Sequence, residues 1–237
     1  MKIIFSLFFW LVTALMTVGV FLAELLIAVF LFPFDRKKKI AHAQGFWWAD
    51  TIMGINPFWG VTIDGLEHAD PDKAYVIVAN HQSLADIVML YKTHLQFKWV
   101  AKESLFRIPV FGWNMSLMRY IRLSRGEFGS IKDTYRQASY WLSQGISVLF
   151  FPEGTRSTTG KLNEFKNGAF KLAIREKKPI LPIRIEGSYE IIPRGSWIFK
   201  GRHFCRLTLL PEIATAHLQE KNFLLLKEEV RRAISGS

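Results

Sequence analysis

The chain has 237 residues, of which half are hydrophobic and 14% are aromatic. This length and composition favour one folded domain with a substantial core and exclude a disordered chain. The net charge of +11 at pH 7 indicates an acidic partner: nucleic acid, an anionic membrane surface or anionic substrates. The one cysteine, Cys205, excludes an internal disulfide framework, and its apolar surroundings favour a buried structural thiol.

The N-terminal segment is long and apolar. Ile3 to Phe34 is almost continuously apolar, and the basic run from Arg36 to Lys39 follows it. More than about 18 apolar residues are enough to cross a bilayer, and no small-residue cleavage site of a signal peptide ends the segment. The positive charge after it predicts that the chain from Arg36 onward is cytoplasmic. Because Glu24 is costly at bilayer depth, the segment is expected either to span the bilayer or to enter one leaflet.

A second segment, from Ile40 to Trp59, mixes the tryptophans Trp47 and Trp48 with polar side chains. This mixture is typical of a helix that lies at the membrane interface and not of a second full span. We therefore predict a membrane-anchoring helical segment over residues 1–60 and a folded domain on the cytoplasmic side over residues 61–237.

After Gly65 the chain alternates between strand-like and helix-like segments, without an internal repeat. This alternation predicts an α/β fold, with a largely parallel sheet flanked by helices. The expected strands are Ala74–Ala79, Lys98–Ala101, Tyr120–Leu123, Ser147–Phe151, Ile180–Ile185 and Arg206–Leu210. The expected helices are Leu84–Tyr91, Gly112–Met118, Ser130–Ser143, Gly168–Glu176 and Asn222–Ile234.

A short polar segment follows the first of these strands and supplies an imidazole, His81, and a carboxylate, Asp86. If His81 lies in the loop and Asp86 in the first turn of the next helix, the two side chains can meet. A carboxylate on one ring nitrogen fixes the tautomer and raises the basicity of the other nitrogen. The alternative is a capping box, in which Ser83 caps the helix and Asp86 reaches back to its start. The spacing alone leaves both interpretations open.

A second polar segment follows the expected strand at Ser147–Phe151 and contains Glu153, Gly154, Thr155 and Arg156. The glycine lets a ligand approach the backbone, the threonine offers a hydroxyl, and the arginine can hold phosphate oxygens with two parallel hydrogen bonds. The alternative is a solvated turn with a surface ion pair.

Three further cations, Lys102, Arg122 and Arg125, lie at or just after the ends of two other expected strands. Because parallel strands end at one edge of a sheet, we expect these cations to converge with His81 on one crevice.

Other kinds of catalytic site find little support in the chain. No serine lies in a Gly-x-Ser-x-Gly nucleophile elbow. The six histidines have no metal-ligand spacing and no cysteine pair exists, so we expect no metal site. Nucleic-acid binding would require a basic stripe with interleaved aromatic residues, whereas the cations here cluster beside the membrane segment and at strand ends.

The segment from Ala74 to Ser188 resembles the membrane-bound glycerolipid acyltransferases, most closely the bacterial 1-acylglycerol-3-phosphate (lysophosphatidate) acyltransferases. The first block of that family, Asn-His-x4-Asp, corresponds to Asn80-His81 through Asp86. The third block, Phe-Pro-Glu-Gly-Thr-Arg-Ser, is complete from Phe151 to Ser157. The fourth block, a hydrophobic strand with a proline, corresponds to Ile180-Leu181-Pro182-Ile183.

The second block of the family matches only in part. Lys102, the segment Ile108-Pro109-x-Phe111-Gly112 and Arg125 fit the family pattern. Arg119-Tyr120 stands in place of the usual Gly-Asn, and Ser124 in place of an aspartate. Since the family uses this block for the acceptor, the difference concerns the identity of the acceptor and not the chemistry.

The resemblance implies acyl transfer from an acyl thioester, either acyl-coenzyme A or acyl-carrier protein as co-substrate, to the free hydroxyl of a lysophospholipid, with no other cofactor. His81, oriented by Asp86, is implied as the catalytic base. Arg125, Glu153, Gly154, Thr155 and Arg156, with Lys102 in addition, are implied to organise the acceptor phosphate, Glu153 by orienting its neighbours. The implied location is the inner (cytoplasmic) membrane, with the acyltransferase domain on the cytoplasmic side.

Two alternatives remain open at this point. The same chemistry could serve another lysophospholipid, glycerol 3-phosphate or a lyso-aminolipid. A protein of a different class, which binds membranes without catalysis, would also have a basic face, although it would have no need of His81, Asp86 and the Glu153–Arg156 segment.

Overall fold

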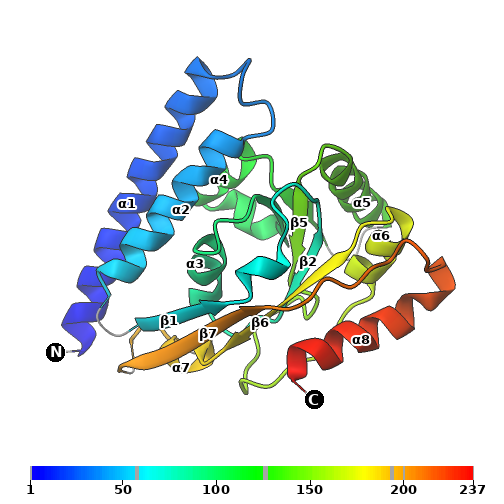
Figure 1. The fold of residues 1–237 in the computed structure, drawn as a ribbon. Helices are drawn as coiled ribbons and strands as arrows, with labels where there is room; N and C mark the ends of the chain where they lie inside the picture. The colour runs from blue at the N-terminus through cyan, green and yellow to red at the C-terminus, as the bar shows by residue number, and fades with distance from the viewer. Residues whose placement is uncertain (1, 57–58, 125–127, 193–194, 200, 237) are drawn as a thin grey trace.

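A single seven-stranded sheet organises the molecule, as the computed structural model of residues 2–56, 59–124, 128–192, 195–199 and 201–236 shows (Figure 1). The strand order is β1-β7-β6-β2-β5-β3-β4. Every pairing is parallel except that of β6 with β7. The strands are β1 (Trp59–Asp64), β2 (Val76–Ala79), β3 (Phe97–Lys102), β4 (Ile121–Leu123), β5 (Ser147–Phe150), β6 (Ile180–Glu186) and β7 (His203–Leu209). The predicted α/β fold with a largely parallel sheet is confirmed.

Helices cover both faces of this sheet (Figure 1). The α-helices are α1 (Lys2–Phe30), α2 (Lys39–Gly54), α3 (Ala85–Tyr91), α4 (Phe111–Leu117), α5 (Phe128–Ser143), α6 (Gly168–Arg175), α7 (Ser188–Ile191) and α8 (Phe223–Ser235). Short 3-10 helices are η1 (Leu66–His68), η2 (Glu103–Arg107) and η3 (Glu220–Asn222). One core cluster joins the sheet to α1, α2, α3 and α4, and the other joins it to α5, α6 and α8. Buried strands need such cover on both faces.

The expected strands and helices after Ala74 are present, with ends that differ by a few residues. Strand β1 was not predicted, and the predicted interfacial segment was wrong at its end, because α2 ends at Gly54 and Trp59 begins β1. β1 is an edge strand whose alternation is weak, with Trp59 buried and Val61 and Ile63 only partly buried against the core. Cys205 is buried as expected, and burial raises the pKa of its thiol to about 12.

Helix α1 runs along one side of the molecule, with α2 beside it (Figure 1). By length and composition it is long enough to cross a membrane over Ile3–Phe30. Large apolar side chains recur along its outer face, and Val18, 40% exposed, bridges the interval between Leu15 and Leu22, so the apolar stripe is continuous. More than half of the surface of each of the following is exposed: Ile4, Leu7, Phe8, Leu11, Leu15, Leu22, Leu26, Val29 and Phe30.

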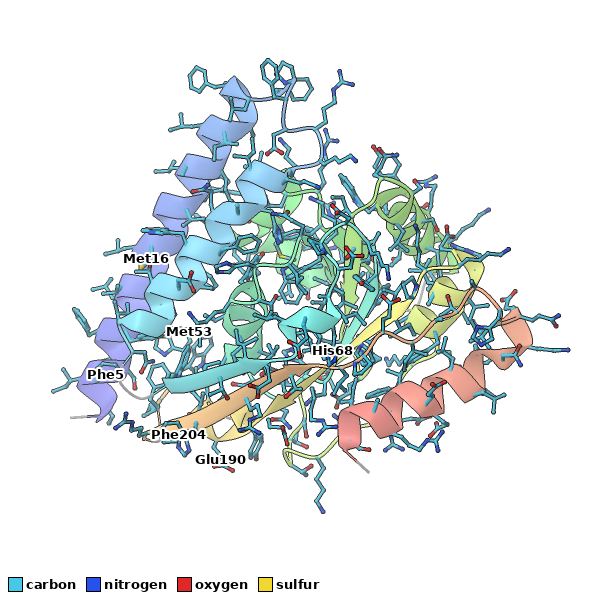
Figure 2. All side chains as sticks on the ribbon, in the orientation of Figure 1. Phe5, Met16, Met53, His68, Glu190 and Phe204 are labelled. Carbon is cyan, nitrogen blue, oxygen red and sulfur yellow. The ribbon has the colours of Figure 1, made fainter. Side chains whose placement is uncertain are left out.

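The inner face of α1 packs on the rest of the protein. Near its N-terminal end, Phe9 packs edge-on against Phe199 and Trp59, with ring centroids 4.8 Å and 5.6 Å away. Figure 2 labels Phe5 near this end of α1 and Phe204 near the start of β7, at one corner of the molecule. The division into residues 1–60 and 61–237 stays a prediction, although these contacts make α1 part of the packed core.

Candidate active site

The site lies where two neighbouring parallel strands, β2 and β5, end. His81 follows β2 by two residues, and Glu153 follows β5 by three. The two loops are joined through their backbones, because Ser157 N donates to His81 O at 2.8 Å. The fold therefore brings together the two polar segments that the sequence separates by 72 residues.

His81 and Asp86 form a hydrogen-bonded pair. His81 Nδ1 lies 2.8 Å from Asp86 Oδ2, and the Asp86 side chain is fully buried. The same Oδ2 accepts hydrogen bonds from the backbone N–H groups of Gln82 and Ser83, at 2.7 and 2.9 Å. The carboxylate thus orients the imidazole and also reaches back to the Ser83 N–H, but the N-cap of α3 is Leu84 without a side-chain cap, so the predicted capping by Ser83 was wrong. This arrangement leaves Nε2 as the ring nitrogen that can take a proton.

An aromatic ring also holds the imidazole of His81. The ring of Phe151 stacks on it, with centroids 3.9 Å apart and an interplanar angle of 11°. The ring of Trp99 in turn lies near that of Phe151, with centroids 5.7 Å apart. One hydrogen bond and one stacked ring together fix the plane of the imidazole before any substrate binds.

Glu153 connects the two loops through its carboxylate. Its Oε1 accepts the backbone N–H of His81 and its Oε2 accepts that of Asn163, both at 2.8 Å. The side chain is 5% exposed, and this burial raises the pKa of its carboxyl. Gly154 follows with a φ of 69°, a left-handed conformation that favours glycine. Glu153 therefore fixes the shape of the loop from which Arg156 projects.

A cavity of about 380 Å³ opens at this site. His81, Gly154, Thr155 and Arg156 line it, and Lys102 reaches it from the end of β3. Arg122 does not join them, so that part of the predicted convergence was wrong: its guanidinium lies over the Phe106 ring and donates to Ser116 Oγ at 3.0 Å. Arg125, also predicted for the site, lies outside the described residues.

The remaining wall of the cavity is mainly apolar and comes largely from elements that the sequence reading had not assigned to the site. Helix α1 supplies Thr17, Val20 and Glu24, and α2 supplies Gly45 and Trp48. Glu24 is 3% exposed and accepts a hydrogen bond from Asn114 of α4. A signal for this wall was present in the sequence, because a carboxylate within an apolar helix requires a buried partner.

Comparison with known proteins agrees with this geometry. Residues 60–186 match the profile of the Acyltransferase family. A chloroplastic 1-acyl-sn-glycerol-3-phosphate acyltransferase of Brassica napus is 40% identical over 169 residues, which cover 70% of this chain and 48% of that protein. A 1-acyl-sn-glycerol-3-phosphate acyltransferase of Pseudomonas aeruginosa is 31% identical over 152 residues, 64% of this chain and 57% of that one. The chain thus spans about half the length of these relatives.

A solved structure extends the likeness to the whole fold. The crystal structure of the 1-acyl-sn-glycerophosphate (LPA) acyltransferase PlsC from Thermotoga maritima superposes with a TM-score of 0.81 at 27% sequence identity. The superposition covers 99% of this chain, N-terminal helices included, and 95% of that chain. Since the profile spans more than half of the sequence and contains both polar loops, the chain belongs to the Acyltransferase family.

Proposed function

We propose that this protein transfers a fatty acyl group from an acyl thioester to the free hydroxyl of 1-acylglycerol-3-phosphate, which gives phosphatidate for phospholipid synthesis. One observation carries the proposal: a single cavity holds the His81 imidazole, a cationic loop and an apolar wall. A base, an anion site and a lipid-binding wall are the three features that acylation of a lysophospholipid needs.

His81 acts as the general base in this proposal. Its Nε2 takes the proton of the lysophospholipid hydroxyl while the oxygen attacks the thioester carbonyl. The new C–O ester bond forms, the C–S bond breaks with its electron pair going to sulfur, and His81 gives the proton to the leaving thiolate. Asp86 stays ionised, holds Nδ1 and stabilises the imidazolium between the two proton transfers. The thioester is acyl-coenzyme A or acyl-carrier protein, and no further cofactor takes part.

The phosphate of the acceptor binds at the cationic rim. The guanidinium of Arg156 suits a two-pronged contact with phosphate oxygens, and Lys102 adds a second charge at the same cavity. Beside these two cations, Gly154 offers its backbone and Thr155 a hydroxyl group. The family pattern also assigns Arg125 to phosphate binding. Glu153 serves by holding the loop, since both of its carboxylate oxygens are already bonded to backbone N–H groups.

The apolar wall accommodates an acyl chain of the reacting lipids. The wall reaches α1, whose outer face presents an unbroken apolar stripe. A chain that leaves the bilayer beside α1 therefore stays in apolar surroundings until it reaches the site, which avoids the cost of exposing it to water.

The contacts of α1 favour insertion into one leaflet over a full span. Near its N-terminal end, Trp10 Nε1 donates to Trp197 O at 2.6 Å and Ser6 Oγ accepts the Phe199 N–H at 3.1 Å. Near its C-terminal end, Glu24 is bonded to Asn114. A helix held lengthwise on the domain in this way cannot stand across a bilayer while the domain stays in water. We place the protein on the cytoplasmic face of the inner membrane, with α1 lying in the near leaflet.

Product analysis tests the proposal. The purified chain in phospholipid vesicles receives either acyl thioester and one acceptor at a time: lysophosphatidate, glycerol 3-phosphate, a neutral lysophospholipid or a lyso-aminolipid. Mass spectrometry is expected to find phosphatidate from lysophosphatidate at the highest rate. A higher rate with another acceptor would show that this acceptor is the preferred substrate, and the proposed acyl-transfer reaction would still hold. Absence of transfer in every combination would favour a membrane-binding protein without catalysis.

A further inference from the structure

A second exposed apolar surface lies on the segment that joins β3 to β4. It consists of Leu105, Ile108, Phe111 and Trp113, which are 37%, 45%, 42% and 57% exposed, and we refer to it as the η2–α4 face. Four large apolar side chains within nine residues are unusual on a surface that faces water, and such patches mark interaction sites.

The η2–α4 face is continuous with α1. The rings of Trp113 and Phe21 of α1 lie 6.3 Å apart, and Asn114 Nδ2 donates to Glu24 Oε2. Helix α1 also packs against α4, as it does against α2. The face therefore extends the apolar surface of α1 sideways, toward the end of β3.

The cavity meets this surface. Leu105 and Phe111 line the cavity and are also exposed, so they form part of its rim. Lys102, at the end of β3, lies on the same rim three residues before Leu105. Along the chain, the cation Lys102, near the catalytic end of the cavity, therefore precedes the apolar rim residues Leu105 and Phe111.

The backbone of this segment is strained at one residue. Val110 has φ 61° and ψ −60°, and the Phe111 N–H bonds to Pro109 O at 2.7 Å across it, which closes a γ-turn. A β-branched residue rarely adopts such a conformation, and strain of this kind clusters at functional sites. Gly112 follows, where a Cβ would lie only 2.2 Å from Phe106 O. The tight turn separates η2 from α4 and leaves Ile108 and Phe111 exposed on either side of it.

From these observations we infer that the η2–α4 face inserts into the same lipid leaflet as α1 and forms the edge across which an acyl chain passes from the bilayer into the cavity. The partner is the acyl-chain region of a phospholipid bilayer, with tryptophan at its boundary. Arg107, whose side chain is 79% exposed and lies 3.6 Å from Glu103, is in the same segment, where it can meet lipid phosphates. The inference rests on the proposed membrane-bound acyltransferase function.

Depth-dependent fluorescence tests the insertion. A polarity-sensitive dye is attached to Ile108→Cys and, in a second variant, to Trp113→Cys of the full chain in vesicles of phosphatidylcholine and phosphatidylglycerol. The wild-type chain serves as the labelling blank, because its single cysteine is buried. Leu22→Cys on α1 is the membrane-buried reference. Leu225→Cys is the water-exposed reference, because Leu225 is 70% exposed and belongs to α8, a helix on the side of the molecule away from α1 (Figure 1).

We expect the emission of the dyes at positions 108 and 113 to shift to the blue when vesicles are added. Spin-labelled acyl chains should quench this emission to an extent within about twofold of that at position 22, and should not quench the dye at position 225. Dyes at positions 108 and 113 that behave like the Leu225 dye, with the Leu22 dye quenched, would overturn this inference alone. A Leu22 dye that also behaves as in water would instead overturn the membrane-bound function on which it rests.

An activity measurement tests the passage of the chain. Ile108→Ser combined with Trp113→Ser leaves the residues that line the cavity unchanged. We expect the double variant to lose roughly tenfold in kcat/KM on long-chain lysophosphatidate in vesicles and to keep wild-type activity on a short-chain soluble acceptor. The matched control is Leu224→Ser with Leu225→Ser on α8. An equal loss on both acceptors, or an equal loss in the control, would contradict the role of this face as the entry edge.

Discussion

The two ends of the cavity are built on different physical principles. At the catalytic end, hydrogen bonds of 2.7–2.9 Å fix Asp86, His81 and Glu153 to one another and to the backbone. At the membrane end, α1, α2 and α4 enclose a mainly apolar space, with Glu24 and Asn114 as a polar pair in the wall. The catalytic end fixes the positions and orientations of individual polar atoms, whereas the membrane end sets the size and shape of an apolar volume.

This difference separates the two tasks of the site. A proton transfer depends on the position and charge of one atom, so small changes at the catalytic end should lower turnover with every substrate. Binding of an alkyl chain depends on the buried area and the available volume, so changes at the membrane end should discriminate between chain lengths. The predictions below test that separation, from the largest expected effect to the smallest.

Removal of the base has the largest expected effect. His81→Ala should lower kcat by about 10²–10⁴-fold, because the imidazole that accepts the proton of the hydroxyl is lost. Sedimentation with liposomes should show unchanged membrane binding. His217→Ala, which removes an exposed histidine far along the chain, is the matched control and should keep wild-type turnover. Near-normal turnover in folded His81→Ala protein would show that another group is the base.

A change in the shape of the cationic group at the rim of the cavity should weaken binding of the acceptor. Arg156→Lys keeps the positive charge and loses the planar fork, so the KM for lysophosphatidate should rise roughly fivefold to tenfold. The KM for the thioester should stay close to that of the wild type. Steady-state kinetics with each substrate varied in turn measures both values. A rise confined to the thioester would move this loop away from acceptor binding.

A change of volume at the membrane end should alter chain-length preference. Val20 lines the cavity and is 7% exposed, so Val20→Phe should exclude about two methylene groups and lower kcat/KM for the longest chains roughly tenfold. Chain length is varied first on the thioester and then on the lysophospholipid. Val18→Phe, on the exposed face of α1, is the matched control and should leave the preference unchanged. Equal effects of the two substitutions would argue against a chain in this cavity.

The smallest effect concerns pH and stability. His42 of α2 is buried, with its Nδ1 3.0 Å from Tyr120 Oη, and burial lowers its pKa from 6.5 to about 3. Between these values the unfolded chain binds a proton that the folded chain does not. The free energy of unfolding should therefore fall by up to about 1.4 kcal/mol for each pH unit below 6.5. Denaturant unfolding in detergent at pH 7, 6 and 5 should show this component in the wild type and not in His42→Asn.

The catalytic end was largely predictable from the sequence, because one of its contacts is local and the others follow from the order of parallel strands. His81 and Asp86 are five residues apart, and the loops that follow two neighbouring parallel strands had to meet at one edge. Arg122 was misplaced because strand position alone does not tell whether a side chain turns toward the edge or stacks on a nearby ring such as Phe106.

The membrane end was predicted only in outline. The length of α1 and the cost of Glu24 were evident, yet no local pattern indicates which residues of an apolar helix face a cavity and which face lipid. That choice depends on distant partners such as Asn114 and Phe199. Strand β1 was missed for a related reason: as a half-covered edge strand, it has only a weak alternation of buried and exposed residues.

The most direct test of the separation between the two ends is the chain-length dependence of Asp86→Asn. This variant keeps an oxygen for the backbone N–H groups but removes the charge behind the imidazole. The expected result is that kcat falls between about tenfold and a hundredfold by the same factor on short-chain and long-chain substrates. A loss of kcat that grows or shrinks with acyl-chain length, in correctly folded protein, would contradict the account. The catalytic carboxylate would then also contribute to the selection of acyl-chain length.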